Sequence, residues 1–303
     1  MIHNFKFRQF VLKLLTPMVK FNDWLIDNIG LYNGVKRLKR LSEKHTDKLI
    51  TDKILSGKPF AIGRYGHTEF CSIMRIGNYK YHKKSLNIGG IHANIYDQWE
   101  KLYWESSKDL DIISVWNYRT NYVAKIKFMK KMPNVEYLIP LQFWNPLRER
   151  KWLQTLKNKK LLVVNPFVKT IKLQYSKREE IGILPELKSL ELVKSVVSLM
   201  EIGEEFDWFG ALESMKREIA TRDFDIAFIG CATYGLPLAT YIKQLGKQAI
   251  VLGGITQLYF GIKGSRWYND PDFKKAVNEH WISILDEEIH PKFREIENGC
   301  YLG

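Results

Sequence analysis

The stretch Ala227-Phe-Ile-Gly-Cys-Ala-Thr-Tyr-Gly-Leu-Pro-Leu-Ala-Thr-Tyr-Ile-Lys-Gln-Leu-Gly-Lys-Gln-Ala-Ile-Val-Leu-Gly-Gly254 decides the fold. The apolar run 226–229, which begins one residue before this stretch, is typical of a buried parallel strand and leads into a turn bounded by Gly230 and Gly235. A helical apolar period follows the turn, and the run 249–252 predicts a second strand. Strand, turn, helix and strand form a βαβ unit, whose helix N-terminus offers N–H groups and a partial positive charge to a phosphate.

The turn of this unit differs from the fingerprint of dinucleotide-binding proteins. Gly-x-Gly-x-x-Gly would need a glycine where Ala232 stands, and an acidic residue about 20 positions later would bind the ribose. The second strand instead ends in Gly253 and Gly254. We read this as evidence against NAD and not against a nucleotide in general. A plain βα turn of an α/β fold is the alternative.

Short apolar runs alternate with helical patterns along the rest of the chain. The runs lie at 60–63, 111–116, 135–139 and 161–165, with a further, ambiguous one at 190–200. This alternation predicts a Rossmann-like α/β fold with a parallel sheet of about six strands and helices on both faces. We expect one domain over residues 46–303, preceded by a helical extension over residues 1–45.

The expected N-terminal extension is basic and amphipathic. Residues 1–40 contain eight Lys and Arg against Asp23 and Asp27, and apolar residues recur there at spacings of three and four. Pro17 breaks or kinks the pattern. Such a helix can lie on an anionic membrane surface, and the alternative is a helix that packs on its own domain.

The composition narrows the class of protein and its partners. A net charge of +14, from 47 basic and 33 acidic residues, favours an anionic partner: nucleic acid, a membrane surface or a phosphorylated substrate. Solvated lysine faces are the alternative. No apolar run of about 18 residues and no signal-peptide pattern occurs, and three widely spaced cysteines are typical of a reducing compartment. We therefore expect a cytoplasmic protein.

Several common catalytic motifs are missing from the sequence. It contains no Walker loop, no nucleophile elbow and no His or Cys pair at metal-binding spacing. P-loop NTPases, serine hydrolases and zinc proteases are therefore not leading candidates. No recognised nucleic-acid-binding motif occurs either.

Polar residues follow the apolar run 60–63, where a parallel sheet binds its ligands. Arg64 can pair with a diphosphate through two hydrogen bonds, and Gly66 permits a close backbone approach. Glu69 can ligate a divalent metal or act as a base. In the alternative interpretation, Glu69 only complements its own helix N-terminus and Arg64 is its surface partner.

A second group of candidates follows the strand at 249–252. The loop 253–267 holds four glycines and then Lys263, Arg266 and Trp267. Two cations and an aromatic ring suit a nucleoside diphosphate, although a solvated connecting loop is the alternative. Asn165, at the end of another predicted strand, could line the same site.

Residues Phe60-Ala-Ile-Gly-Arg-Tyr-Gly-His-Thr-Glu-Phe70 resemble the Arg-Phe-Gly-Asp-Gly-Glu signature of the GT-D type glycosyltransferases. These are Rossmann-like bacterial enzymes that transfer sugars from nucleotide-sugar donors. Later stretches resemble one branch of this group, from surface-polysaccharide loci: Val164-Asn-Pro-Phe167, Trp208-Phe-Gly-Ala-Leu-Glu-Ser-Met215, the 230–254 unit, Phe260-Gly-Ile-Lys-Gly-Ser-Arg-Trp267, Asn278-Glu-His-Trp281 and Glu297-Asn-Gly-Cys-Tyr301. The resemblance covers residues 50–303.

The resemblance implies a hexosyltransferase that uses a nucleotide sugar, a UDP-sugar, and a bacterial cell-surface glycan or lipid-linked glycan as acceptor. The basic extension would then meet the inner face of the plasma membrane. The implied diphosphate-binding residues are Arg64, Gly66, Gly230, Thr233, Tyr234, Gly235, Lys263 and Arg266. Asn165 and Trp267 would contact the base or sugar of the donor, and Glu69 and His67 would be catalytic.

The signature differs from this sequence at one position that bears on mechanism. His67 stands where the family has an aspartate. Either His67 and Glu69 share a divalent metal, Mn²⁺ or Mg²⁺, or Arg64, Lys263 and Arg266 neutralise the leaving diphosphate without one. Two other functions stay open: an NAD(P)-linked Rossmann oxidoreductase, and a non-enzymatic basic protein that binds membrane or nucleic acid.

Overall fold

The computed structural model describes residues 39–40, 42–74, 86, 90–115, 135, 137–148, 150–197, 207–294 and 299–302. Most of the expected N-terminal extension, residues 1–38, lies outside this described part of the chain. The membrane-binding helix expected there is therefore not tested.

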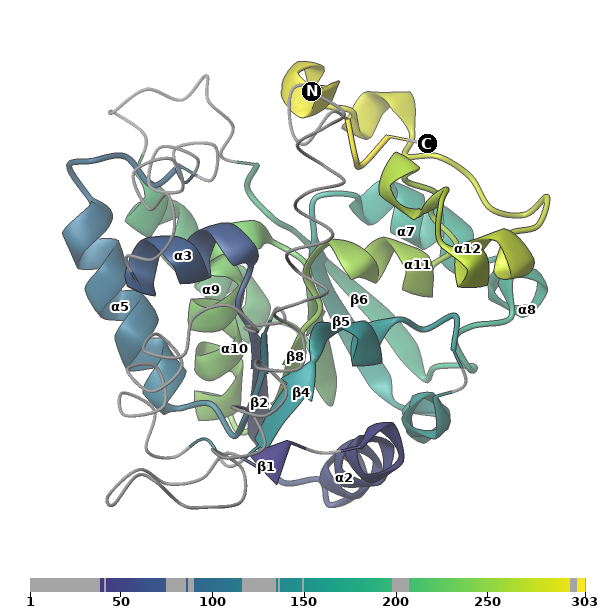
Figure 1. The fold of residues 1–303 in the computed structure, drawn as a ribbon, viewed down its shortest axis with the longest axis horizontal. Helices are drawn as coiled ribbons and strands as arrows, with labels where there is room; N and C mark the ends of the chain where they lie inside the picture. Colours follow the sequence, from purple (N-terminus) through teal and green to yellow (C-terminus); the bar gives the residue numbers. More distant parts are fainter. Residues whose placement is uncertain are drawn as a thin grey trace, which may run out of the picture.

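A single sheet of parallel strands forms the centre of the molecule (Figure 1). Its eight strands are arranged in the order β1-β4-β3-β2-β8-β7-β5-β6. Their bounds are β1 Lys39–Arg40, β2 Phe60–Arg64, β3 Ile112–Val115, β4 Tyr137–Pro140, β5 Lys160–Asn165, β6 Ser189–Lys194, β7 Ile226–Ile229 and β8 Gln248–Val251. The predicted Rossmann-like α/β class is confirmed. The sheet has more strands than the six expected, because the two-residue strand β1 forms one edge and β6, the ambiguous run of the sequence, forms the other.

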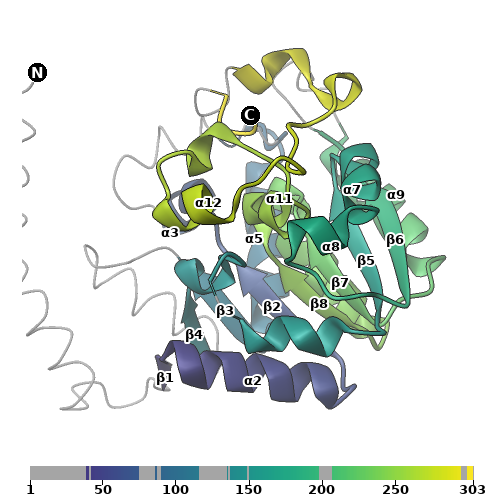
Figure 2. The same ribbon diagram turned by 90° about the vertical axis from the view of Figure 1, so that its right-hand side faces the viewer.

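Helices cover both faces of the sheet, as Figures 1 and 2 show. One face packs against helices α3 (His67–Met74), α5 (Tyr96–Lys108), α9 (Trp208–Ala220) and α10 (Gly235–Gln244). The other packs against α2 (Glu43–Leu55), α7 (Val168–Tyr175), α8 (Arg178–Ile181), α11 (Thr256–Tyr259), α12 (Pro271–Ala276) and the 3₁₀ helix Lys151–Leu156. Successive strand residues alternate between the two cores: Ala227 packs in the first and Phe228 in the second.

The βαβ unit predicted from the sequence consists of β7, α10 and β8. Pro237 lies in the first turn of α10, where its missing N–H costs no hydrogen bond. Gly235 begins that helix, and a Cβ atom there would lie 2.9 Å from a methyl group of Val251 on β8. The glycine thus allows the helix to pack closely on the sheet.

Helix α2 contains the expected boundary between residues 45 and 46. It begins at Glu43 because Ser42 caps it: the Ser42 hydroxyl accepts a hydrogen bond from the His45 amide at 3.3 Å. Among the described helices, none combines the length and apolar character that crossing a membrane requires.

Candidate functional site

The candidate site lies at the carboxyl ends of β2 and β8, which are neighbours in the sheet. After β2 the chain turns to the face covered by α3, and after β8 it turns to the face covered by α11. Figure 1 shows these two helices leaving the same end of the sheet in opposite directions. Strands whose connections diverge in this way present their ends to a ligand.

Arg64, the last residue of β2, lies against the turn that follows β8. Its Nη1 atom donates a hydrogen bond to the carbonyl oxygen of Leu252. A Cβ atom at Gly253, whose φ is +65°, would overlap the same guanidinium. The Arg64 Nε atom is shielded from solvent and has no hydrogen-bond partner in the described part of the chain. One shielded donor of this half-buried cation is therefore left for a bound acceptor.

The surroundings of Arg64 shift the pKa of its guanidinium in both directions. Burial lowers the pKa of the guanidinium, and the nearby cation Arg266 lowers it further, whereas the Glu69 carboxylate raises it. An arginine keeps its charge through such shifts. The uncompensated part of that charge makes this end of the sheet attractive to an anion.

Arg266 lies against the next residue of the same turn, Gly254. It belongs to the short 3₁₀ helix Ser265–Trp267, and a Cβ atom at Gly254 would lie 2.8 Å from its Nη1. Its guanidinium carbon lies 4.3 Å from the centre of the Tyr301 ring. Arg64 and Arg266 therefore flank the Gly253–Gly254 backbone, a pair of cations suited to a diphosphate.

Glu69 and His67 both lie on the first turn of α3, and each contacts a different neighbour. A Cβ atom at Gly66 would overlap Oε2 of Glu69, so that carboxylate folds back toward the start of the helix. The His67 ring lies beside Cys71, with Nε2 3.7 Å from its Sγ. Residues two apart on a helix do not face each other. A metal site shared by His67 and Glu69 therefore stays a prediction.

The side chains that bind metals do not form a cluster in the described part of the chain. No group of three or more His, Cys, Asp and Glu there is arranged to hold a metal ion. A divalent cation at this site would find one protein carboxylate, Glu69, and would need its other ligands from substrate oxygens and water, as Mg²⁺ commonly does.

Asn165 and Gly230 join the ends of β5 and β7. The Asn165 amide donates to the Gly230 carbonyl oxygen at 3.3 Å and accepts from the Phe167 amide at 3.0 Å. A Cβ atom at Gly230 would lie 2.7 Å from the Thr256 hydroxyl oxygen. Asn165 is buried and used for backbone contacts, so its expected contact with the donor base or sugar has no support here.

Thr233 and Tyr234 are buried rather than presented to a ligand. The Tyr234 ring stacks on Trp208 with ring centres 4.6 Å apart, and the Thr233 hydroxyl accepts from the Trp208 indole at 3.1 Å. The amides of Tyr234 and Gly235 donate within the 3₁₀ turn before α10. The expected phosphate cradle at this helix start is thus largely occupied by the protein's own contacts. Ala232 has a φ of 48°, a strained conformation for alanine.

Lys263 and Trp267 have no described contact with Arg64 or with the Gly253–Gly254 turn. The Lys263 amide donates to the Ile282 carbonyl oxygen at 2.8 Å, and its side chain forms no ion pair within the described residues. Trp267 packs against the core on the α11 face, and its ring lies 5.8 Å from the Arg266 guanidinium carbon. Neither side chain is placed beside Arg64.

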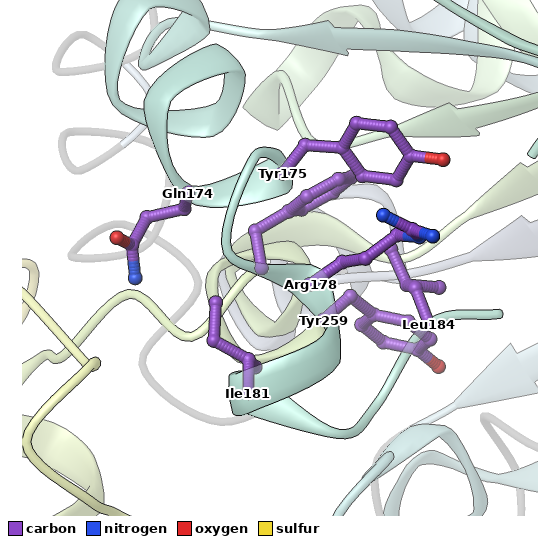
Figure 3. A pocket seen from close by; sticks show the side chains of 7 residues that line it. Gln174, Tyr175, Arg178, Ile181, Leu184 and Tyr259 are labelled. Carbon is purple, nitrogen blue, oxygen red and sulfur yellow. The ribbon is translucent and has the colours of Figure 1, made fainter. Parts of the chain in front are cut away.

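A small pocket lies elsewhere, between α7, α8 and α11. Figure 3 shows the residues that line it, among them Gln174, Arg178 and Tyr259. The Arg178 guanidinium pairs with Glu179 at 2.8 Å, and the Tyr259 hydroxyl donates to the Trp144 carbonyl oxygen at 2.8 Å. The protein thus satisfies Arg178 and Tyr259, whereas the Gln174 Oε1 atom is buried and has no hydrogen-bond partner in the described part of the chain. The pocket has no pair of cations comparable to Arg64 and Arg266.

Two contributors to the site were not among the candidates from the sequence. Tyr301 supplies the ring under Arg266, and Gly254 supplies the backbone on which Arg266 rests. Tyr301 lies 35 positions from Arg266 in the chain, and no local periodicity links them. The one feature of the sequence that could have indicated Tyr301 is its place in the stretch 297–301, which resembles the glycosyltransferase branch.

Three solved structures are similar to this chain. One is described as domain of unknown function 1792; it covers 82% of this chain and 95% of its own, at 12% identity and a TM-score of 0.45. Another is described as that domain with a distinct glycosyltransferase fold; it has the same two coverages, at 11% identity and a TM-score of 0.46. The third, "A New Glycosyltransferase (DUF1792) from Streptococcus sanguinis", covers 81% of this chain and 98% of its own at 11% identity and a TM-score of 0.43. No protein-family model and no curated protein matches the sequence.

Proposed function

We propose that this protein is a glycosyltransferase that moves a sugar from a nucleotide-sugar donor, a UDP-sugar, to a bacterial cell-surface glycan or lipid-linked acceptor. The observation that carries the proposal is the pair of arginines, Arg64 and Arg266, which lie against Gly253 and Gly254 of one turn. The resemblance of residues 60–70 to a glycosyltransferase signature supports the choice of sugar transfer among reactions of phosphorylated substrates.

In the proposed reaction, the diphosphate of the donor binds between the two guanidinium groups. The bond from the sugar to the diphosphate breaks, and the charge that develops on the leaving phosphate is stabilised by Arg64 and Arg266. The acceptor hydroxyl forms the new bond to the sugar and loses its proton. Glu69, whose carboxylate lies in the electrostatic environment of Arg64, takes this proton as general base.

The rival functions have weaker support. An NAD(P)-linked oxidoreductase would need an acidic residue at the end of β8 for the ribose, but the cation Arg64 lies against that position. A non-enzymatic basic protein would bind DNA or anionic vesicles in a salt-dependent manner without binding nucleotide sugars. A cytoplasmic location, with residues 1–45 at the inner face of the plasma membrane, belongs to the proposal.

The test measures binding of UDP by calorimetry and release of UDP from a panel of UDP-sugars, with Mn²⁺ and with EDTA. Arg64→Met and Arg266→Met should each weaken UDP binding by about tenfold or more, the usual loss for a charge-assisted hydrogen bond. Arg222→Met is the matched control, because Arg222 pairs with Glu218 and Glu191 on the surface. Unchanged binding in both site variants would overturn the proposal.

A further inference from the structure

The described C-terminal segment, residues 299–302, is attached to the loop that carries Arg266. The amide of Ser265 donates to the Leu302 carbonyl oxygen at 2.7 Å. The side-chain amide of Gln257 donates to the Tyr301 carbonyl oxygen at 3.3 Å. The last described residues of the chain are thus tied to the segment that follows β8.

The Arg266 guanidinium lies over the face of the Tyr301 ring. The guanidinium carbon lies 4.3 Å from the ring centre, and a Cβ atom at Gly254 would lie 3.5 Å from the ring edge. Two further rings hold this one in place: Phe167 at 6.2 Å and Phe293 at 5.9 Å between ring centres. The ring therefore belongs to a packed aromatic cluster and presents a fixed face to the cation.

Backbone contacts of the same segment restrict Arg266 further. Its Nε atom donates to the Cys300 carbonyl oxygen at 3.4 Å, and Nη2 contacts the Cys300 sulfur. Arginine has a long, flexible side chain, so an exposed guanidinium samples many positions. Contacts from ring, carbonyl oxygen and sulfur select the one position that lies over Gly254.

We propose that Tyr301 is a positioning residue of the diphosphate site. Its ring holds the Arg266 guanidinium against the Gly253–Gly254 turn, near Arg64, so that both cations meet one diphosphate. This inference rests on the proposed function and adds to it that the C-terminal segment forms part of donor binding. The Tyr301 phenol group also lies in the electrostatic environment of Arg64. In this proposal the ring face, which Tyr301→Phe keeps, carries the effect on Arg266.

The experiment measures UDP binding by calorimetry in the full chain, with inorganic pyrophosphate as a second probe. Tyr301→Leu removes the ring and should weaken binding of both probes by about tenfold, the range of a desolvated cation–π contact. Tyr301→Phe keeps the ring and should restore binding to the level of the unmodified protein. Tyr268→Leu is the control, because Tyr268 is an exposed tyrosine close to Arg266 in the same loop.

A double variant shows whether Tyr301 acts through Arg266. In the Arg266→Met background, Tyr301→Leu should weaken UDP binding no further, because the group that it positions is gone. Equal losses in both backgrounds would overturn the inference, as would normal binding by Tyr301→Leu. Thermal unfolding of every variant separates a local effect from a loss of fold.

The two proposals fail in different ways. If Arg64→Met and Arg266→Met both bind UDP normally, the proposed function fails. If those two variants lose binding while Tyr301→Leu retains it, only the role of Tyr301 fails.

Discussion

The guanidinium of Arg64 rests on the backbone of Gly253, so closely that a Cβ atom at that position would overlap Nη1. Gly253 also has a φ of +65°, in the left-handed region where L side chains are strained. The glycine therefore serves two purposes: it permits the turn after β8, and it leaves the space in which the buried arginine lies.

Gly253→Ala should therefore harm both stability and ligand binding. The left-handed conformation alone costs about 1–2 kcal/mol for alanine, and displacement of Arg64 should weaken UDP binding by about tenfold or more. Gly57→Ala is a matched control, because Gly57 has the same φ of +65° and no atom within 4 Å of its Cβ position. Denaturant unfolding and calorimetry would measure the two effects. If the two variants bind UDP equally well, the contact with Arg64 has no role in binding.

Glu69→Gln separates catalysis from donor binding. Loss of a general base should slow UDP release from the donor in the presence of acceptor by about 100-fold or more. Affinity for UDP should not fall, because the change removes a negative charge beside Arg64. Glu105→Gln, on the exposed face of α5, is the control. A variant with full turnover and weakened UDP binding would show that Glu69 is not the base.

Glu288 stabilises the start of α7 from a distant part of the chain. Its buried carboxylate accepts hydrogen bonds from the amides of Lys169 and Thr170, both at 2.8 Å, and from the Thr170 hydroxyl at 2.6 Å. Glu288→Gln should lower the free energy of unfolding by about 1–3 kcal/mol, because a charged acceptor is lost from a buried cap.

The neighbouring Glu287 offers a matched comparison for that measurement. Its exposed carboxylate pairs with the Lys169 ammonium at 3.0 Å. Glu287→Gln should therefore change the free energy of unfolding by less than about 1 kcal/mol. Urea unfolding of both variants would test this difference. Equal losses would show that the cap contributes no more than a surface ion pair.

Three buried tyrosines should resist ionisation in the folded protein. Burial raises the pKa of Tyr65, Tyr103 and Tyr259 above the usual value near 10. Because the unfolded chain loses these protons first, their contribution to stability is complete below about pH 10 and falls as the pH rises above it. Tyrosinate absorbance should therefore show a late phase that coincides with alkaline unfolding. A single phase near pH 10 in the folded protein would contradict this.

Local patterns in the sequence were sufficient for the elements around the site. The apolar run before Gly230, the helical period after Gly235 and the run at 249–252 gave the βαβ unit, because buried strands and amphipathic helices have distinct periods. The same logic placed Arg64 and Glu69 after β2. The edge strand β6 stayed ambiguous because it is only partly buried along most of its length.

Side-chain direction was the part of the site that these patterns did not resolve. Thr233 and Tyr234 follow a strand, as the residues of a phosphate-binding turn would. In the structure both side chains are buried, because the Trp208 indole on α9 donates to the Thr233 hydroxyl and stacks on the Tyr234 ring. That outcome depends on a residue that is distant from both in the sequence.

By itself, the sequence determined the α/β class, the βαβ unit and the presence of cations after two strands, because these depend on periodicity and on turn chemistry within short segments. Only the tertiary structure decided which cations meet. Arg64, Gly253 and Arg266 come together because β2 and β8 are hydrogen-bonded neighbours although 188 positions separate Arg64 from Leu252. Tyr301 joins them because an aromatic cluster and backbone hydrogen bonds fix the end of the chain there, and such long-range packing leaves no mark on local sequence.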